Sequence, residues 1–104
     1  MTHDMTTMLV VCTGGPGVRF DRDYYANEHF ALARACWEAH GLQSAEAFFP
    51  YAEGGGWLSM GVYTFSSEQG MHDALASPKT QQVMDDVKNF TDAIVVLRSL
   101  FTAF

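Results

Sequence analysis

The best-placed candidates for proton transfer in this sequence are His29, Tyr25 and Tyr63. Histidine changes charge near neutral pH and can act as a general acid or base. His29 follows Tyr25 by one helical turn, and helical spacing places it at the edge of an inward-facing apolar stripe. Tyr63 lies in mid-strand, where a buried hydroxyl needs a partner. We therefore predict a catalytic site in which His29 is the acid/base and Tyr25 or Tyr63 orients the substrate.

A hydrogen-bonded core histidine is the alternative interpretation of His29, because a single inward histidine often only supports its neighbours. A metal site is weakly supported. His29 and His40 lie ~16 Å apart along a helix, which is too far to share one ion. Cys12 and Cys36 lie in apolar surroundings in different elements, so we expect free core cysteines and no disulfide. We expect no bound metal and no cofactor.

The composition narrows the class of protein. The chain has 104 residues, which predicts one domain over residues 1–104. Its formal net charge is −6, and its six Lys and Arg residues are scattered, so we expect no nucleic-acid partner and no anionic membrane surface. No apolar run approaches the ~20 residues of a membrane-spanning helix, and the N-terminus has no signal-peptide pattern. We therefore expect a cytoplasmic protein.

Turn and cap signals divide the chain into six elements. Asp21 is a candidate N-cap, Phe20 and Tyr25 a hydrophobic staple, and Gly41 a left-handed helix end. Ser66 and Gln69 have the spacing of a capping box. The predicted elements are a strand at Met5–Thr13, a helix at Arg22–His40, strands at Ser44–Tyr51 and Trp57–Phe65 joined by Gly54-Gly55-Gly56, a helix from Ser66 that restarts at Ser77-Pro78 and runs to about Asn89, and a strand at Asp92–Phe104.

The order βαββαβ predicts an α+β, ferredoxin-like fold with a four-stranded antiparallel sheet and helices on one face. The runs Met8–Cys12 and Ile94–Leu97 are apolar at every position, so both faces of their strands should be covered. We expect a homodimer in which two sheets pack face to face into a shared α/β barrel. Coverage of that face by loops or by the C-terminal tail is the alternative.

Helical spacing also assigns faces to the side chains. The predicted inward stripe of the first helix contains Tyr25, Leu32, Cys36 and Ala39. A second strip should pack on the other helix or on the dimer mate, and it consists of Ala26, Phe30 and Trp37. In the second helical segment, the residues predicted to face inward are Val83, Met84 and Val87.

Three motifs follow one another along the chain and cover nearly all of it. They are Phe20-Asp21-x-x-Tyr24-Tyr25-x-x-x-His29-x-x-Leu32, Ala74-Leu75-x-Ser77-Pro78 and Asp86-Val87-x-Asn89-Phe90-Thr91-Asp92. With these motifs the sequence resembles the EthD family of small dimeric α/β-barrel proteins. The resemblance differs at Phe30-Ala31, where the family often has Ala-Pro after the histidine.

The resemblance implies a cytoplasmic bacterial dimer whose named relatives are associated with ethyl tert-butyl ether degradation, beside an oxidising system. Similar barrel families include cofactor-free monooxygenases of polyketide phenols, lactone isomerases, polyketide cyclases and haem-handling enzymes. The leading hypothesis is thus a cofactor-free enzyme that acts on a small apolar or aromatic molecule through His29. The alternatives are a non-catalytic accessory protein for an oxygenase, an isomerase or cyclase, and haem binding through His29.

Overall fold

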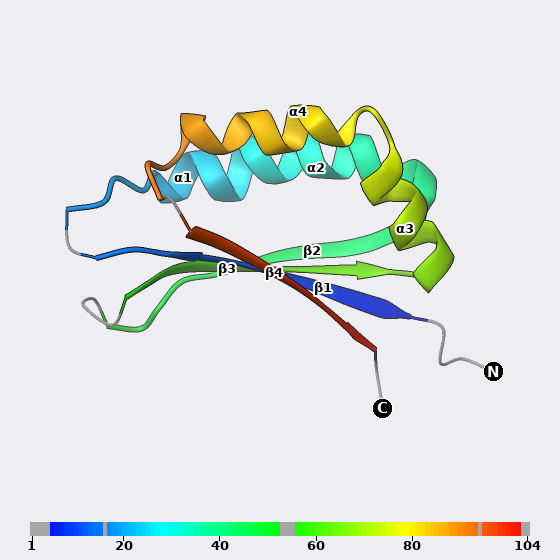
Figure 1. Ribbon diagram of the computed structural model, residues 1–104, viewed down its shortest axis with the longest axis horizontal. Helices are drawn as coiled ribbons and strands as arrows, with labels where there is room; N and C mark the ends of the chain where they lie inside the picture. The colour runs from blue at the N-terminus through cyan, green and yellow to red at the C-terminus, as the bar shows by residue number, and fades with distance from the viewer. Residues whose placement is uncertain (1–4, 16, 53–55, 94, 103–104) are drawn as a thin grey trace.

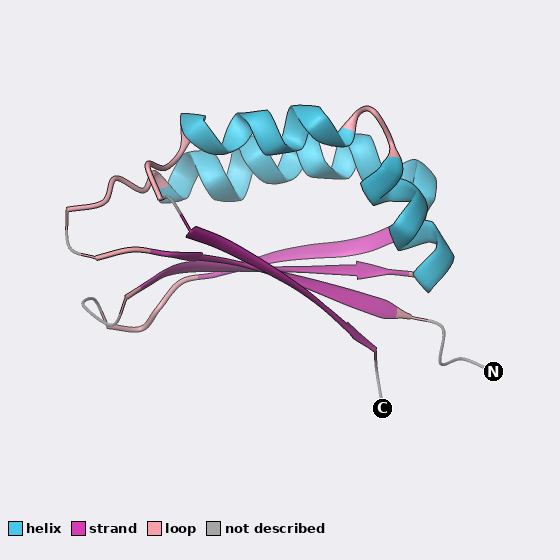
Figure 2. Ribbon diagram, viewed as in Figure 1, coloured by secondary structure: helices cyan, strands magenta, loops and turns pink. Residues whose placement is uncertain are grey.

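The computed structural model describes residues 5–15, 17–52, 56–93 and 95–102, and of residues 95–102 the backbone alone. Helices cover one face of an antiparallel sheet (Figures 1 and 2). The strands are β1 (Thr6–Thr13), β2 (Leu42–Phe48), β3 (Trp57–Phe65) and β4 (Val95–Thr102). The helical segments are α1 (Arg22–Tyr24), η1 (Tyr25–His29), α2 (Phe30–Trp37), η2 (Glu38–His40), α3 (Glu68–Ala76), α4 (Thr80–Asp85) and η3 (Asp86–Asn89).

The four strands are ordered β2-β3-β1-β4, and every neighbouring pair is antiparallel. Met8 of β1 lies opposite Tyr63 of β3, and Val10 lies opposite Gly61. This register brings Tyr63 to the middle of the sheet beneath the helices. The predicted α+β class with an antiparallel sheet is confirmed.

The first helix begins as its sequence signals predict. The backbone N–H of Tyr24 donates to Asp21 Oδ1 at 3.0 Å, and the rings of Phe20 and Tyr25 pack edge to face at 5.2 Å. Gly41 ends the helix with φ +94°, a left-handed conformation that favours glycine. These local contacts set where the helix enters and leaves the layer.

The helical segments together span Arg22–His40 as predicted, but the interior is not a uniform α-helix. Tyr25–His29 forms a π-helical turn, in which the Phe30 N–H donates to the Tyr25 carbonyl five residues earlier, and the last turn is a 3₁₀-helix. A wider turn rotates everything after it relative to an ideal α-helix. Phe30 and Trp37 are therefore core residues, whereas Ala39 of the predicted inward stripe is exposed.

The second helical segment differs from its prediction in two places. Ser67, not Ser66, is the N-cap, and its hydroxyl accepts from the Gly70 N–H at 3.0 Å. The chain breaks between α3 and α4 at Ser77-Pro78 as predicted. Val83 of α4 is buried, whereas Met84 is 49% exposed and lines a cavity.

Some of the observed strand boundaries differ from the predicted ones by two or three residues. The predicted strand Ser44–Tyr51 lies at Leu42–Phe48, and the last strand, Val95–Thr102, begins at Val95 and not at Asp92. Most of the predicted Gly54-Gly55-Gly56 loop, both ends of the chain and the side chains of Ile94–Leu97 lie outside the described residues. None of the described helices has the length and apolar character needed to cross a membrane.

The core between the layers is built from apolar side chains of both. Met8, Phe30, Phe65, Met71 and Phe90 are each at most 1% exposed. Phe30 and Trp37 of the second strip predicted from the first helix lie here too, and Trp37 Nε1 donates to Thr80 Oγ1 at 2.8 Å, which ties α2 to α4. The two cysteines are buried and free, as predicted.

Candidate functional site

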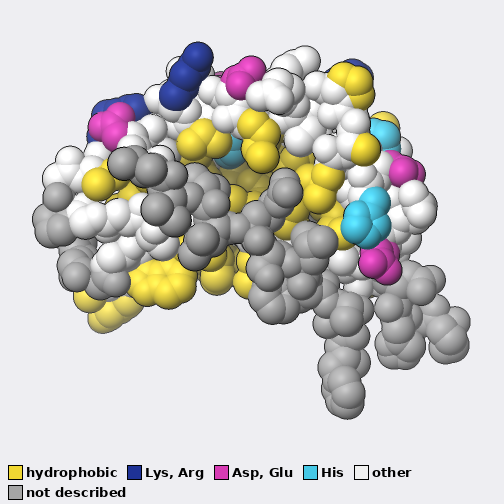
Figure 3. Space-filling view, in the orientation of Figure 1, with side chains coloured by type: hydrophobic (Ala, Val, Ile, Leu, Met, Phe, Trp, Pro, Cys, Tyr) yellow, Lys and Arg dark blue, Asp and Glu magenta, His cyan; other side chains and the backbone are white. Residues whose placement is uncertain are grey.

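A cavity of about 520 Å³ lies between the helices and the sheet. Residues of β1, β3 and the helical segments η1, α2, α3, α4 and η3 line it, among them Val10, His29, Trp37, Tyr63, Val83 and Val87. Figure 3 shows hydrophobic side chains gathered in the hollow below the helical layer. A volume of this size suits a small organic ligand.

His29 reaches the cavity from the π-helical turn. Its imidazole is only 6% exposed and lies between aromatic rings. The Tyr25 ring stacks nearly parallel to it with centroids 5.8 Å apart, and Phe90 meets it edge-on at 4.7 Å. These contacts hold the ring in one orientation, so that its position is set by the packing of two separate segments.

Asp86 holds one side of this imidazole. Its Oδ2 lies 2.8 Å from His29 Nδ1, and its side chain is 11% exposed. The other oxygen, Oδ1, accepts from the Tyr24 hydroxyl at 2.7 Å and from Asn89 Nδ2 at 2.9 Å. Within the described part of the chain, no hydrogen bond engages His29 Nε2. This nitrogen is therefore the ring atom available to a ligand.

The surroundings shift the pKa values of both groups downward. Burial lowers the pKa of His29 below its usual 6.5, although the nearby Asp86 carboxylate partly opposes this. Burial works against ionisation of Asp86, but hydrogen bonds from Asn89, Tyr24 and His29 outweigh it and lower the pKa of this carboxyl. At neutral pH the pair is thus a carboxylate beside a neutral imidazole.

The two predicted tyrosines have different positions. Tyr63 is 2% exposed and lines the cavity together with His29. Tyr25 is not among the residues lining it, and its hydroxyl lies close to Gly61 on β3, buried and without a hydrogen-bond partner among the described residues. Burial raises the pKa of Tyr25 to about 12 and raises that of Tyr63 as well, so both phenols are neutral.

Sequence reasoning missed Asp86 as a site residue. It stands 57 positions from His29, and no local spacing relates the two. The signal in the sequence was the motif that begins at Asp86-Val87. The family resemblance used this motif, but it gave Asp86 no role. The same short segment provides Asn89, which binds Asp86, and Phe90, which packs on His29.

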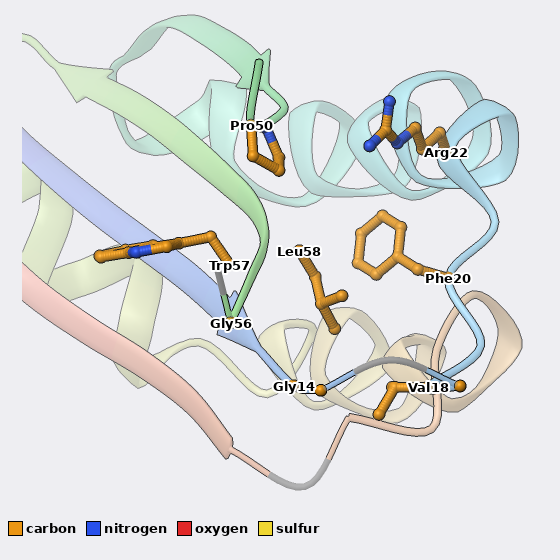
Figure 4. Close-up of a pocket in the computed structure, with 10 residues that line it drawn as sticks. Gly14, Val18, Phe20, Arg22, Pro50, Gly56, Trp57 and Leu58 are labelled. Atoms are coloured by element: carbon orange, nitrogen blue, oxygen red, sulfur yellow. The ribbon is translucent and has the colours of Figure 1, made fainter. Parts of the chain in front are cut away.

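A second cavity of about 460 Å³ lies beside the start of α1 and contains none of the predicted site residues. Figure 4 shows Phe20 and Leu58 facing each other in it, with the Trp57 indole directed away from them. The Arg22 guanidinium lies 4.8 Å from the centre of the Phe49 ring. Among the described residues, no group of three or more His, Cys, Asp and Glu side chains could hold a metal ion.

Several solved structures have this fold. An EthD-like protein of Ralstonia eutropha matches 93% of this chain and 91% of its own at 19% identity and TM-score 0.75. SnoaB of Streptomyces nogalater, a cofactor-independent oxygenase, matches 97% and 94% at 16% identity and TM-score 0.71. A dimeric ferredoxin-like protein of unknown function from Bacteroides fragilis matches 95% and 96% at 10% identity and TM-score 0.55.

At these identities the structures show the ferredoxin-like fold alone. No curated protein sequence is significantly similar to the chain. The sequence profile of the EthD domain, however, matches residues 18–94, which is more than half of the chain and includes His29, Tyr63 and Asp86. The chain therefore belongs to the EthD family.

Proposed function

We propose that this protein is a cofactor-free enzyme that binds a small, mostly apolar or aromatic organic molecule in the cavity and moves a proton on it through His29. One observation carries the proposal. The imidazole lines the cavity, its Nδ1 is held by a carboxylate, and its Nε2 is unengaged within the described part of the chain. A neutral imidazole in that setting is a usable base near neutral pH.

The other residues of the site support this proton transfer. The walls of the cavity are mainly apolar, so they favour a ligand with an aromatic or aliphatic body. Tyr63 lines the same cavity and can orient a polar group of the ligand by its hydroxyl. Tyr25 supports the imidazole by stacking. The reacting proton would lie beside a carbonyl or on a phenol, and the description of SnoaB as a cofactor-independent oxygenase supports chemistry without a bound cofactor.

Turnover of candidate phenols and lactones by the purified protein tests the proposal. His29→Gln keeps a polar side chain of similar size and should lower kcat/KM by roughly 10²- to 10⁴-fold, the usual contribution of a general acid or base. His72→Gln is the matched control, because His72 is an exposed histidine on α3. Equal rates for wild type and His29→Gln would remove His29 from the mechanism.

A non-catalytic binding or accessory role is the second candidate, favoured by the apolar side chains that make up most of the cavity wall. Such a protein would bind ligand with micromolar affinity, retain it in His29→Gln, and form no product. Product formation by the purified protein alone excludes this role. Haem binding through His29 stays a prediction, and the absorption spectrum of protein mixed with hemin tests it.

We further propose that the chain is one domain that pairs with a second copy through the sheet face away from the helices. Leu9, Val11, Met60 and Val62 lie on the face of β1 and β3 opposite to Met8 and Tyr63, and all four side chains are half-buried. Leaving such aliphatic side chains in water costs about 1.5–3 kcal/mol each at full exposure. The Bacteroides protein with the same fold is described as dimeric, which supports the pairing of two copies.

A further inference from the structure

We propose that Asp86 is a positioning residue that keeps the proton of the His29 ring on Nδ1, so that Nε2 begins each reaction as a base. The substrate must then be a weak oxygen or carbon acid, such as a phenol or a compound with a C–H bond beside a carbonyl. This inference rests on the proposed function and deepens it, because it gives the direction of the first proton transfer and the class of substrate.

The hydrogen bonds of Asp86 define the tautomer of His29. An ionised carboxylate accepts hydrogen bonds and cannot donate them. Since Oδ2 lies 2.8 Å from Nδ1, the hydrogen of a neutral imidazole must be on Nδ1. The lone pair of the ring is consequently on Nε2, the nitrogen that no described residue engages.

The carboxylate itself is held by one donor from the first helix and one from its own turn. Tyr24, at the end of α1, and Asn89, at the end of η3, both donate to Oδ1. Asp86 begins η3, and Phe90, directly after this turn, packs against the imidazole. The first helix and the final turn of the helical layer therefore fix the carboxylate and the ring relative to each other, which is the geometry that a positioning carboxylate requires.

The other titratable side chains facing the ring leave Asp86 as the dominant charge. Tyr24 and Tyr25 come from its own helix and Tyr63 from β3, and the pKa of each phenol is raised above its usual value. All three are neutral at physiological pH. Within the described residues, Asp86 is the charged group whose field acts on His29. When the ring accepts a proton, the resulting imidazolium lies beside this carboxylate and is stabilised by it.

The proposed step is an acid–base exchange without a co-reactant. The substrate O–H or C–H bond breaks, its electron pair stays on the substrate as an anion, and the proton forms a new bond to Nε2. The imidazolium later returns that proton to the product. A reaction that begins by protonating a leaving group would need the proton on Nε2 at the outset, and this tautomer does not carry it.

Asp86→Asn tests the inference, because the network dictates how the amide must sit. Tyr24 and Asn89 donate to the Oδ1 position, so the amide oxygen belongs there and the amide nitrogen faces His29 Nδ1. The amide would then donate to Nδ1 and force the ring proton onto Nε2. Long-range ¹H–¹⁵N NMR correlations of the histidine rings distinguish the two neutral tautomers.

We expect the Nδ1–H tautomer in the wild type and the Nε2–H tautomer in Asp86→Asn, at a pH where both rings are neutral. Asp85→Asn is the matched control, since this exposed neighbour bonds to Gln81 and should leave the tautomer unchanged. Tyr24→Phe removes one of the donors to Asp86 and should keep the wild-type tautomer. An Nε2–H ring in the wild type, or an unchanged ring in Asp86→Asn, overturns the inference.

Binding of two probes gives a second readout that does not need turnover. 2-Naphthol can donate its O–H to Nε2, whereas 2-methoxynaphthalene cannot, so the wild type should bind 2-naphthol roughly 2- to 10-fold more tightly. Asp86→Asn should lose this preference because its Nε2 carries a hydrogen. The same preference in both proteins overturns the inference.

Failure of the inference and failure of the proposed function are distinguishable. If activity depends on His29 but the resting His29 ring carries its hydrogen on Nε2, the proposed function stands and the proposed role of Asp86 is wrong. If the tautomers and the probe preference are as expected but the protein turns over no phenol or carbonyl compound, the role of Asp86 is supported and the enzymatic function is rejected. If the protein is active, Asp86→Asn should lower kcat/KM by more than 10²-fold, and the acidic limb of its pH–rate profile should shift to lower pH.

Discussion

Gly61 of β3 lies under the aromatic cluster that supports His29, and a methyl group there should disturb it. A Cβ at Gly61 would lie 2.8 Å from the Tyr25 hydroxyl oxygen, 3.0 Å from Tyr63 Cε2 and 3.3 Å from Phe30 Cζ. Ordinary contacts begin at 3.4 Å, so the hydroxyl must retreat by 0.6 Å (3.4 − 2.8). Tyr25 cannot do so freely, because its ring is packed against His29 and Phe30.

Overpacking of this kind costs about 1–3 kcal/mol of unfolding free energy. For a domain of this size that corresponds to a fall in Tm of roughly 5–20 °C. We therefore expect Gly61→Ala to melt well below the wild type in a thermal unfolding experiment followed by circular dichroism. Gly15→Ala is the matched control, since nothing lies within 4 Å of a Cβ at that exposed position.

Tyr25→Phe, alone and combined with Gly61→Ala, tests whether the Tyr25 hydroxyl causes this loss of stability. The Tyr25 hydroxyl is buried without a hydrogen-bond partner in the described part of the chain, so its removal alone should change the Tm little. In the double variant the shortest contact is gone while those with Tyr63 and Phe30 remain, so part of the stability lost in Gly61→Ala should return. A wild-type Tm for Gly61→Ala, or strictly additive effects in the double variant, would show that the hydroxyl contact does not limit this packing.

Three further outcomes are expected. Because the pKa of His29 is lowered in the folded protein, the unfolded chain binds the extra proton more readily, and the free energy of unfolding should fall as pH drops below 6.5. In urea titrations, His29→Gln should reduce the slope of this free energy against pH. An unchanged slope would contradict burial of a neutral ring. Ser67→Ala should lower the unfolding free energy by about 0.5–2 kcal/mol by removing the cap of α3, and an equal loss in Ser66→Ala would contradict the cap assignment. Val62→Glu should dissociate the proposed homodimer in sedimentation experiments, because Val62 lies on the sheet face proposed as the interface and burying a carboxylate there is costly; a monomeric wild type would reject the dimer itself.

Much of the fold could be predicted because its signals are local. Asp21 capping its helix, Gly41 ending it and Pro78 breaking the second helical segment act on residues within one turn of themselves. Strand ends and the π-helical turn could not be predicted in the same way. They depend on which side chains fit the opposing layer, and the turn at Tyr25–His29 shifts the buried face towards Phe30 and Trp37.

The sequence by itself determined the family, the order of the elements and the inward position of His29, because motifs, caps and helical periodicity are properties of neighbouring residues. Only the tertiary structure decided which groups contact the imidazole. Asp86 reaches Nδ1 from 57 residues away, and the Tyr25 hydroxyl turns towards Gly61, away from the cavity. Such pairings arise when separate segments pack against one another, and no local pattern in the chain encodes which atoms will then be in contact.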